Sequence, residues 1–300
     1  MSPVVRLDVT HTTVARYSAR VEVAYHCAHL APRDDARQQV LAFDLAIDPA
    51  PAQCSRSRDA FGNVRTEFAL YVPHDALTVR ASSRVALRSR ERPLEAAASV
   101  PWTTLASSLR YAVGASFQPA AEFVFASPCV PLLAPLRAYA EPSFTPGRPY
   151  VTGAIELMER IHRDFAYEPG ATEVGTPIEE VFRERRGVCQ DFAHLMLGML
   201  RALGLPARYV SGYLLTQPPP GQARLLGADA SHAWVSVWCP VLGWVDLDPT
   251  NAVLPDRGHV TLAVGRDYGD VTPLRGVILG GASHSVDVAV SVVPVIEQAA

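Results

Sequence analysis

Apolar and polar residues alternate along most of the first ninety positions of the chain. A period of two is clear at Val5, Leu7 and Val9. The same period returns in five later stretches, at residues 21–25, 41–47, 68–72, 77–81 and 85–87. It is typical of β-strands with one buried face, and turn-forming sequences such as DAFGN at 59–63 separate the runs. Six or seven short strands joined in this way predict an antiparallel β-sandwich over residues 1–92.

The following sixty residues have no clear period and are rich in proline. Nine prolines lie between residues 93 and 149, with short helical pieces expected only around 131–140. We therefore expect residues 93–150 to form a connector on the surface between two domains. A helix with one apolar side is predicted for residues 151–166. Another begins at 176–179, where TPIE has the pattern of a capping box with proline in the first turn.

The spacing of apolar residues becomes helical after Val188. They recur every three to four positions as far as Leu203, and Gly204 and Pro206 then suit a helix end. Cys189 would lie in the first turn of this helix, where free N–H groups and the helix dipole favour an anion. Cys189 is therefore a candidate nucleophile.

Two alternating stretches after this helix predict a β-hairpin. One covers residues 231–238 with His232 near its start, and the other covers residues 244–248 and ends before a proline. Pairing of the two strands would bring a carboxylate beside His232. Asp246 and Asp248 are two positions apart and so point to the same face, and either could supply it.

Four short motifs occur in order in this half of the chain: GVCQDFAH at 187–194, GLPARYVSGY at 204–213, SHAW at 231–234, and GW followed by DPTN at 243–251. Together they resemble the transglutaminase-like superfamily of papain-fold cysteine enzymes, in its bacterial two-domain branch. The resemblance implies a catalytic triad of Cys189, His232 and Asp248, and it selects Asp248 over Asp246. It also implies that the DAFGN turn belongs to the N-terminal β-domain of that branch.

The predicted fold class is α+β. An N-terminal antiparallel β-sandwich (1–92) and the proline-rich connector (93–150) precede a papain-like, transglutaminase-like catalytic domain (151–300). In that domain the cysteine helix packs on an antiparallel sheet. Strands expected at 259–262 and 286–293 complete this sheet.

Some neighbours of the triad have both a catalytic and a structural interpretation. Tyr167 stands in YEPG, where the resembling family has YxPG, and its phenol could either donate to an oxyanion or pack against the core. The backbone N–H of Cys189 or Gln190 could also serve an oxyanion hole. Trp234 shares a strand face with His232, so it either shields the imidazole from water or fills core.

Other polar residues around the motifs favour structural roles. Asp191 is expected to cap the cysteine helix. His194 would lie roughly 140° around the helix from Cys189, which disfavours it as the base. Asp59 is expected to support its turn rather than to take part in catalysis. A polar loop in the last segment could line the cleft or form an ion-paired turn, and its candidates are Arg266, Asp267 and Tyr268.

Composition excludes several other classes of function. The formal charge of -3 provides no basic face for nucleic acid, and no apolar run approaches the ~18–20 residues of a membrane-spanning helix. Five widely spaced cysteines do not indicate a disulfide framework, and neither CxxC nor HExxH is present to suggest a metal site. We expect no cofactor, no signal peptide and a cytoplasmic protein whose oligomeric state is open.

The expected chemistry is acyl transfer from amide bonds of peptides or proteins through a thioester on Cys189. Hydrolysis is expected rather than crosslinking, since water needs no recognition and no cluster of acidic residues suggests the calcium site of resembling animal crosslinkers. Three alternatives stay open: a protein-glutamine acyltransferase, another thiol acyltransferase that uses a thioester donor, and a non-catalytic binding module.

Overall fold

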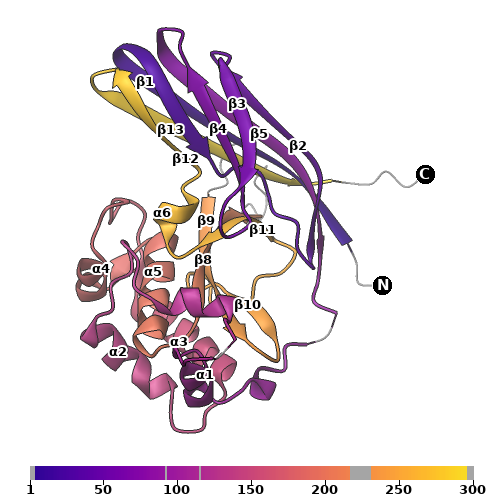
Figure 1. Ribbon diagram of the computed structural model, residues 1–300, viewed down its shortest axis with the longest axis vertical. Coiled ribbons are helices and arrows are strands. Elements are labelled where there is room, and N and C mark those ends of the chain that lie inside the picture. Colours follow the sequence, from indigo (N-terminus) through magenta and orange to yellow (C-terminus); the bar gives the residue numbers. More distant parts are fainter. Residues whose placement is uncertain (1–3, 92, 115, 217–230, 296–300) are drawn as a thin grey trace, which may run out of the picture.

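The structure is a computed structural model that describes residues 4–91, 93–114, 116–216 and 231–295. Figure 1 shows a curved β-sheet, built from both ends of the chain, above a body of helices and a smaller sheet. This arrangement confirms the predicted α+β class.

The first half of the chain supplies β1 (Val4–Ala28), β2 (Gln38–Asp48), β3 (Gln53–Arg58), β4 (Val64–Leu70), β5 (His74–Arg88), α1 (Trp102–Ser108), α2 (Ala134–Ala140) and α3 (Tyr150–Asp164). The second half supplies β6 (Ala166–Tyr167), α4 (Ile178–Glu184), β7 (Arg186–Gly187), α5 (Cys189–Ala202), β8 (Ala207–Leu214), β9 (Ser231–Cys239), β10 (Gly243–Leu247), β11 (His259–Gly265), α6 (Tyr268–Val271), β12 (Leu274–Gly280) and β13 (His284–Pro294). Three 3-10 helices lie at Ala96–Ala98, Pro119–Val124 and Glu141–Ser143.

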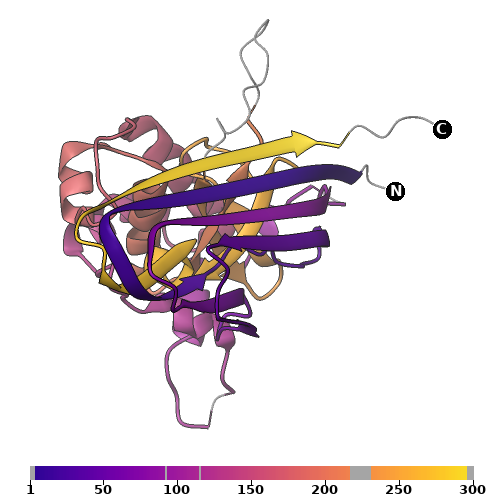
Figure 2. The ribbon, with the colours of Figure 1, turned by 90° about the horizontal axis from the view of Figure 1, so that it is seen from above.

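The central strand of the large antiparallel sheet is β1. Its first half pairs with β5 and β13, and its second half pairs with β4 and β12. Between Arg16 and Val21 the register shifts and the strand bends back on itself (Figure 2). Apolar residues from both halves, including Ala15 and Ala24, share one core. The predicted sandwich is therefore a single sheet folded over at β1.

The strands of the first ninety residues are fewer and longer than the alternation predicts. The stretches 5–9 and 21–25, expected as two strands, belong to β1, and 77–81 and 85–87 both belong to β5. Alternation predicts which face a residue occupies, but a bend that keeps hydrogen bonding leaves no break in the pattern. Five strands therefore replace the expected six or seven.

The expectation that residues 286–293 complete the catalytic sheet is wrong. They lie in β13, which pairs with β1 from Leu7 to Tyr17 in the large sheet (Figure 2). β12 joins the same sheet through β1. The period of two predicts these strands correctly but carries no information about which of two sheets they enter.

The proline-rich segment is not simply a surface connector. Leu105 of α1 and Leu136 of α2 are buried, and with Val130 they pack into the main core around α5. Its prolines are compatible with this role because Pro135 stands in the first turn of α2, where a missing N–H costs nothing.

The smaller sheet has the order β10-β9-β8-β11, and all its neighbours are antiparallel. α5 packs against β8 and β9, with apolar side chains such as Phe192, Leu195 and Met199 almost fully buried. The predicted packing of the cysteine helix on an antiparallel sheet is confirmed. The capping box expected at Thr176 is not formed, because Pro177 occupies the N-cap and the Thr176 hydroxyl accepts from the Glu173 N–H instead, at 2.9 Å. None of the helices among the described residues is long and apolar enough to cross a membrane.

Candidate active site

Cys189 is the first residue of α5 and is half-buried. The turn before it is tight because the Asp191 carboxylate folds back and accepts from the Val188 N–H at 2.8 Å. A Cβ on Gly187 would lie 2.7 Å from that carboxylate oxygen, so only glycine fits there. Asp191 therefore caps the helix as expected, and the backbone presents Cys189 at a helix N-terminus, where free N–H groups favour an anion.

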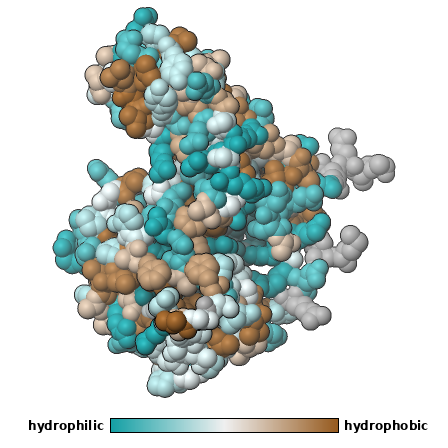
Figure 3. Space-filling view, viewed as in Figure 1, coloured by the Kyte–Doolittle hydropathy of each residue, from teal (hydrophilic) through white to brown (hydrophobic). Residues whose placement is uncertain are grey.

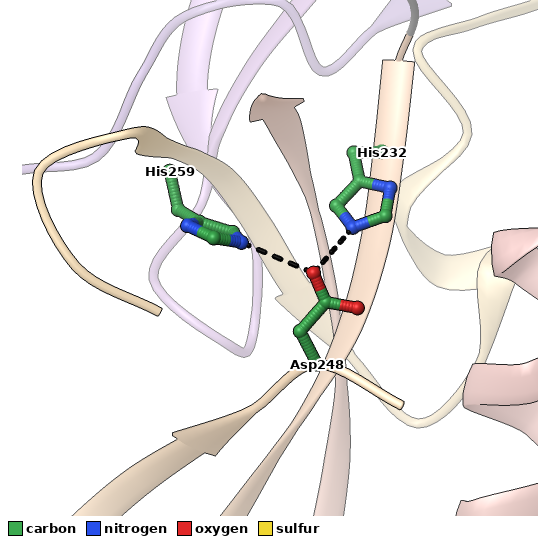
Figure 4. Close-up of side chains that lie close together, drawn as sticks. All are labelled: His232, Asp248 and His259. Carbon is green, nitrogen blue, oxygen red and sulfur yellow. Dashed lines mark hydrogen bonds and ion pairs between the residues drawn. The ribbon is translucent and has the colours of Figure 1, made fainter. Parts of the chain in front are cut away.

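The predicted hairpin places His232 next to a carboxylate. β9 and β10 pair so that Leu247 faces Val235, and Asp248 follows directly. The Nε2 of His232 donates to Oδ2 of Asp248 at 2.8 Å (Figure 4). Asp246, the other candidate, instead pairs with Arg37 at 3.1 Å.

Asp248 is fully buried and surrounded by donors. Its Oδ1 accepts from the N–H groups of Thr250 and Asn251, at 2.9 and 3.2 Å, and the Asn251 side chain donates to Oδ2 at 2.8 Å. Burial alone would raise the pKa of this carboxyl, but hydrogen bonds from His232, His259 and Asn251 hold it well below its usual range. Asp248 is therefore ionised at neutral pH.

His232 connects this carboxylate to the thiol. Burial alone would lower its pKa, but hydrogen bonds and charges from Asp248 and Cys189 raise it to about 9. Since Nε2 serves Asp248, Nδ1 is the nitrogen that faces Cys189. At neutral pH the imidazolium can therefore stabilise a thiolate on one side while it is held by a carboxylate on the other.

A cleft of about 340 Å³ opens at the thiol, between the two parts of the molecule. The part that contains α5 and the smaller sheet contributes Cys189, Gln190, Tyr209, Ser211, His232 and Tyr268 to its lining. The large sheet contributes the opposite wall through His11, Thr13, Val286 and Val288. The outline of the molecule is indented between the two parts (Figure 3). A larger cavity of about 500 Å³, beside Cys27 and Cys54 on the large sheet, contains none of the three predicted triad residues.

His11 joins the two walls of this cleft. Its Nδ1 is 2.9 Å from the Tyr213 hydroxyl of β8, and its Nε2 is 3.1 Å from the Thr13 hydroxyl. Burial lowers the pKa of His11 to about 4, so the ring is neutral at physiological pH. It therefore fixes the large sheet against the catalytic sheet without adding charge to the cleft.

Some of the remaining candidates line the cleft and others lie outside its lining. Gln190 and Tyr268 line the cleft. Tyr167 is about half exposed, and its ring lies edge-on to Phe192. The buried part of the ring and, to a smaller extent, the nearby Cys189 raise the pKa of its phenol. Asp267 is buried and accepts from the N–H groups of Cys129 and Gly269, at 2.9 Å each.

Arg266 forms an ion pair with Asp270 at 2.9 Å, so it belongs to a structural turn. His194 is buried on α5 and accepts from the Tyr268 N–H at 3.2 Å, and burial lowers its pKa to about 4. A structural role for His194 agrees with the prediction.

Trp234 is completely buried and packs with Val210, Val264 and Phe61. Its ring lies 6.1 Å from that of His232 and 5.3 Å from that of His259, centroid to centroid. A Cβ on Gly212 would lie 2.5 Å from this indole, so the glycine makes room for it. Trp234 therefore fills core and also covers the histidine pair.

His259 is a site residue that sequence reasoning missed. Its Nε2 lies 3.1 Å from Oδ2 of Asp248 (Figure 4), although the chain pattern marks it only as the start of a strand. His232, Asp248 and His259 present ligand atoms within 4.8 Å of one another, as a metal site would. Both imidazoles also approach the same carboxylate oxygen, Oδ2 of Asp248, at hydrogen-bonding distances of 2.8 and 3.1 Å. The contacts among the three side chains therefore have the geometry of hydrogen bonds to a shared acceptor.

Comparisons with known proteins agree with this geometry. The model of the transglutaminase-like superfamily matches residues 137–249, and that of the bacterial transglutaminase-like N-terminal region matches residues 7–86. A protein of Mycobacterium tuberculosis is 44% identical over 296 residues, which cover 96% of this chain and 93% of that protein. A protein-glutamine gamma-glutamyltransferase of Pseudomonas aeruginosa is 40% identical over 105 residues, 34% of this chain and 16% of that protein.

Among solved structures, one from Cytophaga hutchinsonii, described as a candidate cysteine protease, has a TM-score of 0.74 and 18% identity. The match covers 100% of this chain and 93% of that one. At this identity the likeness concerns the fold.

Proposed function

The chain belongs to the transglutaminase-like superfamily, and we propose that it is a thiol-dependent acyl-transfer enzyme with Cys189 as nucleophile, His232 as acid and base, and Asp248 as the group that orients His232. The observation that carries the proposal is the continuous contact from Cys189 through His232 to a fully buried Asp248, at the mouth of a cleft.

The proposed reaction begins with attack of the Cys189 thiolate on an amide carbonyl. The carbonyl π bond opens to a tetrahedral oxyanion, which N–H groups at the start of α5 can stabilise. The imidazolium of His232 then gives its proton to the departing amine as the C–N bond breaks, leaving a thioester. Neutral His232 next removes a proton from water, the hydroxide adds to the thioester, and the thiolate leaves as the acid product forms.

We infer that the acyl donor is a peptide or protein segment that enters between the two walls of the cleft. The side chains of Val286 and Val288 are about half exposed on the wall opposite the thiol, where they can contact apolar side chains of such a segment. Main-chain and hydroxyl groups on the other wall, including Ser211, can contact its polar backbone. The cleft is open to solvent along this path, so water reaches the thioester and hydrolysis is the expected outcome.

Transfer to an amine is the second candidate. It is favoured by the 105-residue similarity to a protein-glutamine gamma-glutamyltransferase. The same thioester can react with a lysine amine if the acceptor excludes water. Water and amine must therefore be compared in competition, because the triad is the same for both reactions.

The experiment presents the protein with peptide amides and identifies the acyl group on Cys189 by mass spectrometry. We expect an acyl-enzyme in the wild type and in Cys54→Ala, which removes an exposed thiol outside the cleft, but none in Cys189→Ala. With millimolar primary amine present, free acid should exceed amide product. Mostly amide product would identify an acyltransferase, and acylation by an acyl thioester alone would identify another thiol acyltransferase. Failure of Cys189 to react with any acyl donor would indicate a binding module.

A further inference from the structure

The Asp248 carboxylate serves two histidines rather than one. Its Oδ2 lies 2.8 Å from Nε2 of His232 and 3.1 Å from Nε2 of His259, which approach from β9 and from the start of β11 (Figure 4). The Asp248 side chain has no exposed surface, and each histidine side chain is only 8% exposed. Water is therefore poorly placed to substitute for either donor.

The protonation of His259 follows from this contact. An ionised carboxylate can only accept hydrogen bonds, so Nε2 of His259 must carry a proton. The ring is also held in place. Its edge meets the Trp234 indole at an interplanar angle of 83°, and the backbone N–H of His259 donates to the Asp256 carbonyl at 2.9 Å.

We propose that His259 is a positioning residue for the reaction: its Nε2–H fixes Oδ2 of Asp248, and the carboxylate in turn holds His232 with Nδ1 toward Cys189. The proposal rests on the triad assigned under the proposed function. A carboxylate can rotate about its Cβ–Cγ bond, which would turn either oxygen away from His232. The N–H groups of Thr250 and Asn251 hold Oδ1, while the Asn251 amide and the His259 ring approach the same oxygen as His232. His259 is therefore one of the groups that oppose this rotation, and it acts directly on the oxygen that His232 contacts.

Other charged groups do not replace this contact. Cys189 meets His232 from α5, and Nδ1 of His162 on α3 lies 2.8 Å from the Thr250 carbonyl, near the turn that carries Asp248. On the far side of His259 a small cavity is lined by charged residues of both signs, namely Asp35, Arg37, Arg88, Asp246 and Asp256. Because opposite charges largely offset one another there, the direct hydrogen bond is the stronger influence on Asp248.

Two substitutions separate hydrogen bonding from packing. His259→Phe keeps an aromatic ring beside Trp234 but removes the donor, whereas His259→Gln keeps an N–H at about the position of Nε2. The readout is the rate at which iodoacetamide alkylates Cys189 between pH 4 and 10, which requires no substrate. His26→Phe, a buried histidine stacked on Phe68 in the large sheet, is the matched control.

We expect His259→Phe to slow alkylation at pH 6 by about tenfold to a hundredfold, the effect of one hydrogen bond to a charged group. The acid limb should move to higher pH, because the imidazolium that stabilises the thiolate is held less firmly. His259→Gln should recover most of the rate, and His26→Phe should behave as the wild type.

A wild-type profile for His259→Phe, or a glutamine variant as slow as the phenylalanine variant, would overturn the proposal. Should His259→Phe fail to fold, nitrogen chemical shifts of the wild-type imidazoles decide instead. A proton on Nε2 of His259 at every pH where Cys189 is reactive supports the proposal, and a neutral ring protonated on Nδ1 alone refutes it. These results do not depend on turnover, so an inactive protein would contradict the proposed function without affecting the role of His259.

Discussion

Replacing Asp248 or its neighbour Asp246 by asparagine discriminates between the two carboxylates of the hairpin. Asp248→Asn removes the acceptor of His232 and can present an amide N–H to Nε2 in its place. Asp246→Asn removes the ion pair with Arg37 and a charge that acts on the buried Arg208, but it leaves the acceptor of His232 in place. The two changes are chemically identical and two residues apart, so each controls for the other.

The expected magnitude follows from the imidazole. Raising the pKa of His232 from 6.5 to about 9 corresponds to about 3 kcal/mol in favour of the imidazolium. Asp248 supplies much of this preference, so its removal should return the pKa toward 6.5 or below, because burial acts in that direction. If the loss is expressed fully in the transition state, kcat should fall by about a hundredfold.

The assay is the pH dependence of amide hydrolysis and of Cys189 alkylation. In the wild type and in Asp246→Asn, the rate of amide hydrolysis should fall at alkaline pH near 9, where the imidazolium loses the proton that the departing amine needs. In Asp248→Asn this alkaline fall should move down by about two pH units or more.

The same ion pair affects the stability of the fold. The folded-state pKa of His232 lies above its unfolded value, so the pair of His232 and Asp248 stabilises the fold fully below about pH 6.5 and ceases to do so as pH rises through about 9. The difference in thermal stability between wild type and Asp248→Asn should therefore shrink over the same range. Equal kinetic losses in the two variants, or a larger loss in Asp246→Asn, would refute the assignment.

Two further predictions concern accessibility. At pH 6, iodoacetamide should modify Cys189 fastest, because its neighbour is an imidazolium. Cys54 is exposed and should therefore also be modified, and peptide mapping should find the other cysteines slow: Cys27, Cys129 and Cys239. Val288→Asp should raise KM for peptide amides about tenfold by placing a charge on the cleft wall. It should leave iodoacetamide alkylation of Cys189 unchanged, and Val277→Asp, an exposed valine on β12 outside the cleft lining, should change neither.

The elements that carry the proposed triad are predictable from local features of the sequence. Cys189 stands where an apolar period of three to four begins, and the hairpin that carries His232 and Asp248 is encoded in two alternating runs and a turn. The proposed triad needs only one helix start and one hairpin, and both are local features of the chain. The resemblance was needed to choose Asp248 over Asp246, because the period of two places both on one face.

Residues brought to the site by distant segments could not be predicted in this way. His11 reaches the cleft only because β1 lies over β8, and Val288 reaches it only because β13 joins β1. His259 contacts Asp248 through the pairing of β11 with β8, which no local pattern specifies. Alternation predicts which face of a strand is buried, but it does not predict which strand becomes its neighbour.

The pairing of β1 with β13 also has a consequence for how the chain is made. β1 leaves the ribosome early, but the strand that lies along its first half is synthesised only after the whole catalytic core. The helix and hairpin that carry the proposed triad lie much closer together in sequence, so they can meet while synthesis continues. We therefore expect the core to fold first and the large sheet to close last. A truncated product ending before residue 274 would leave one side of β1 without a partner, and such an unpaired strand edge promotes aggregation.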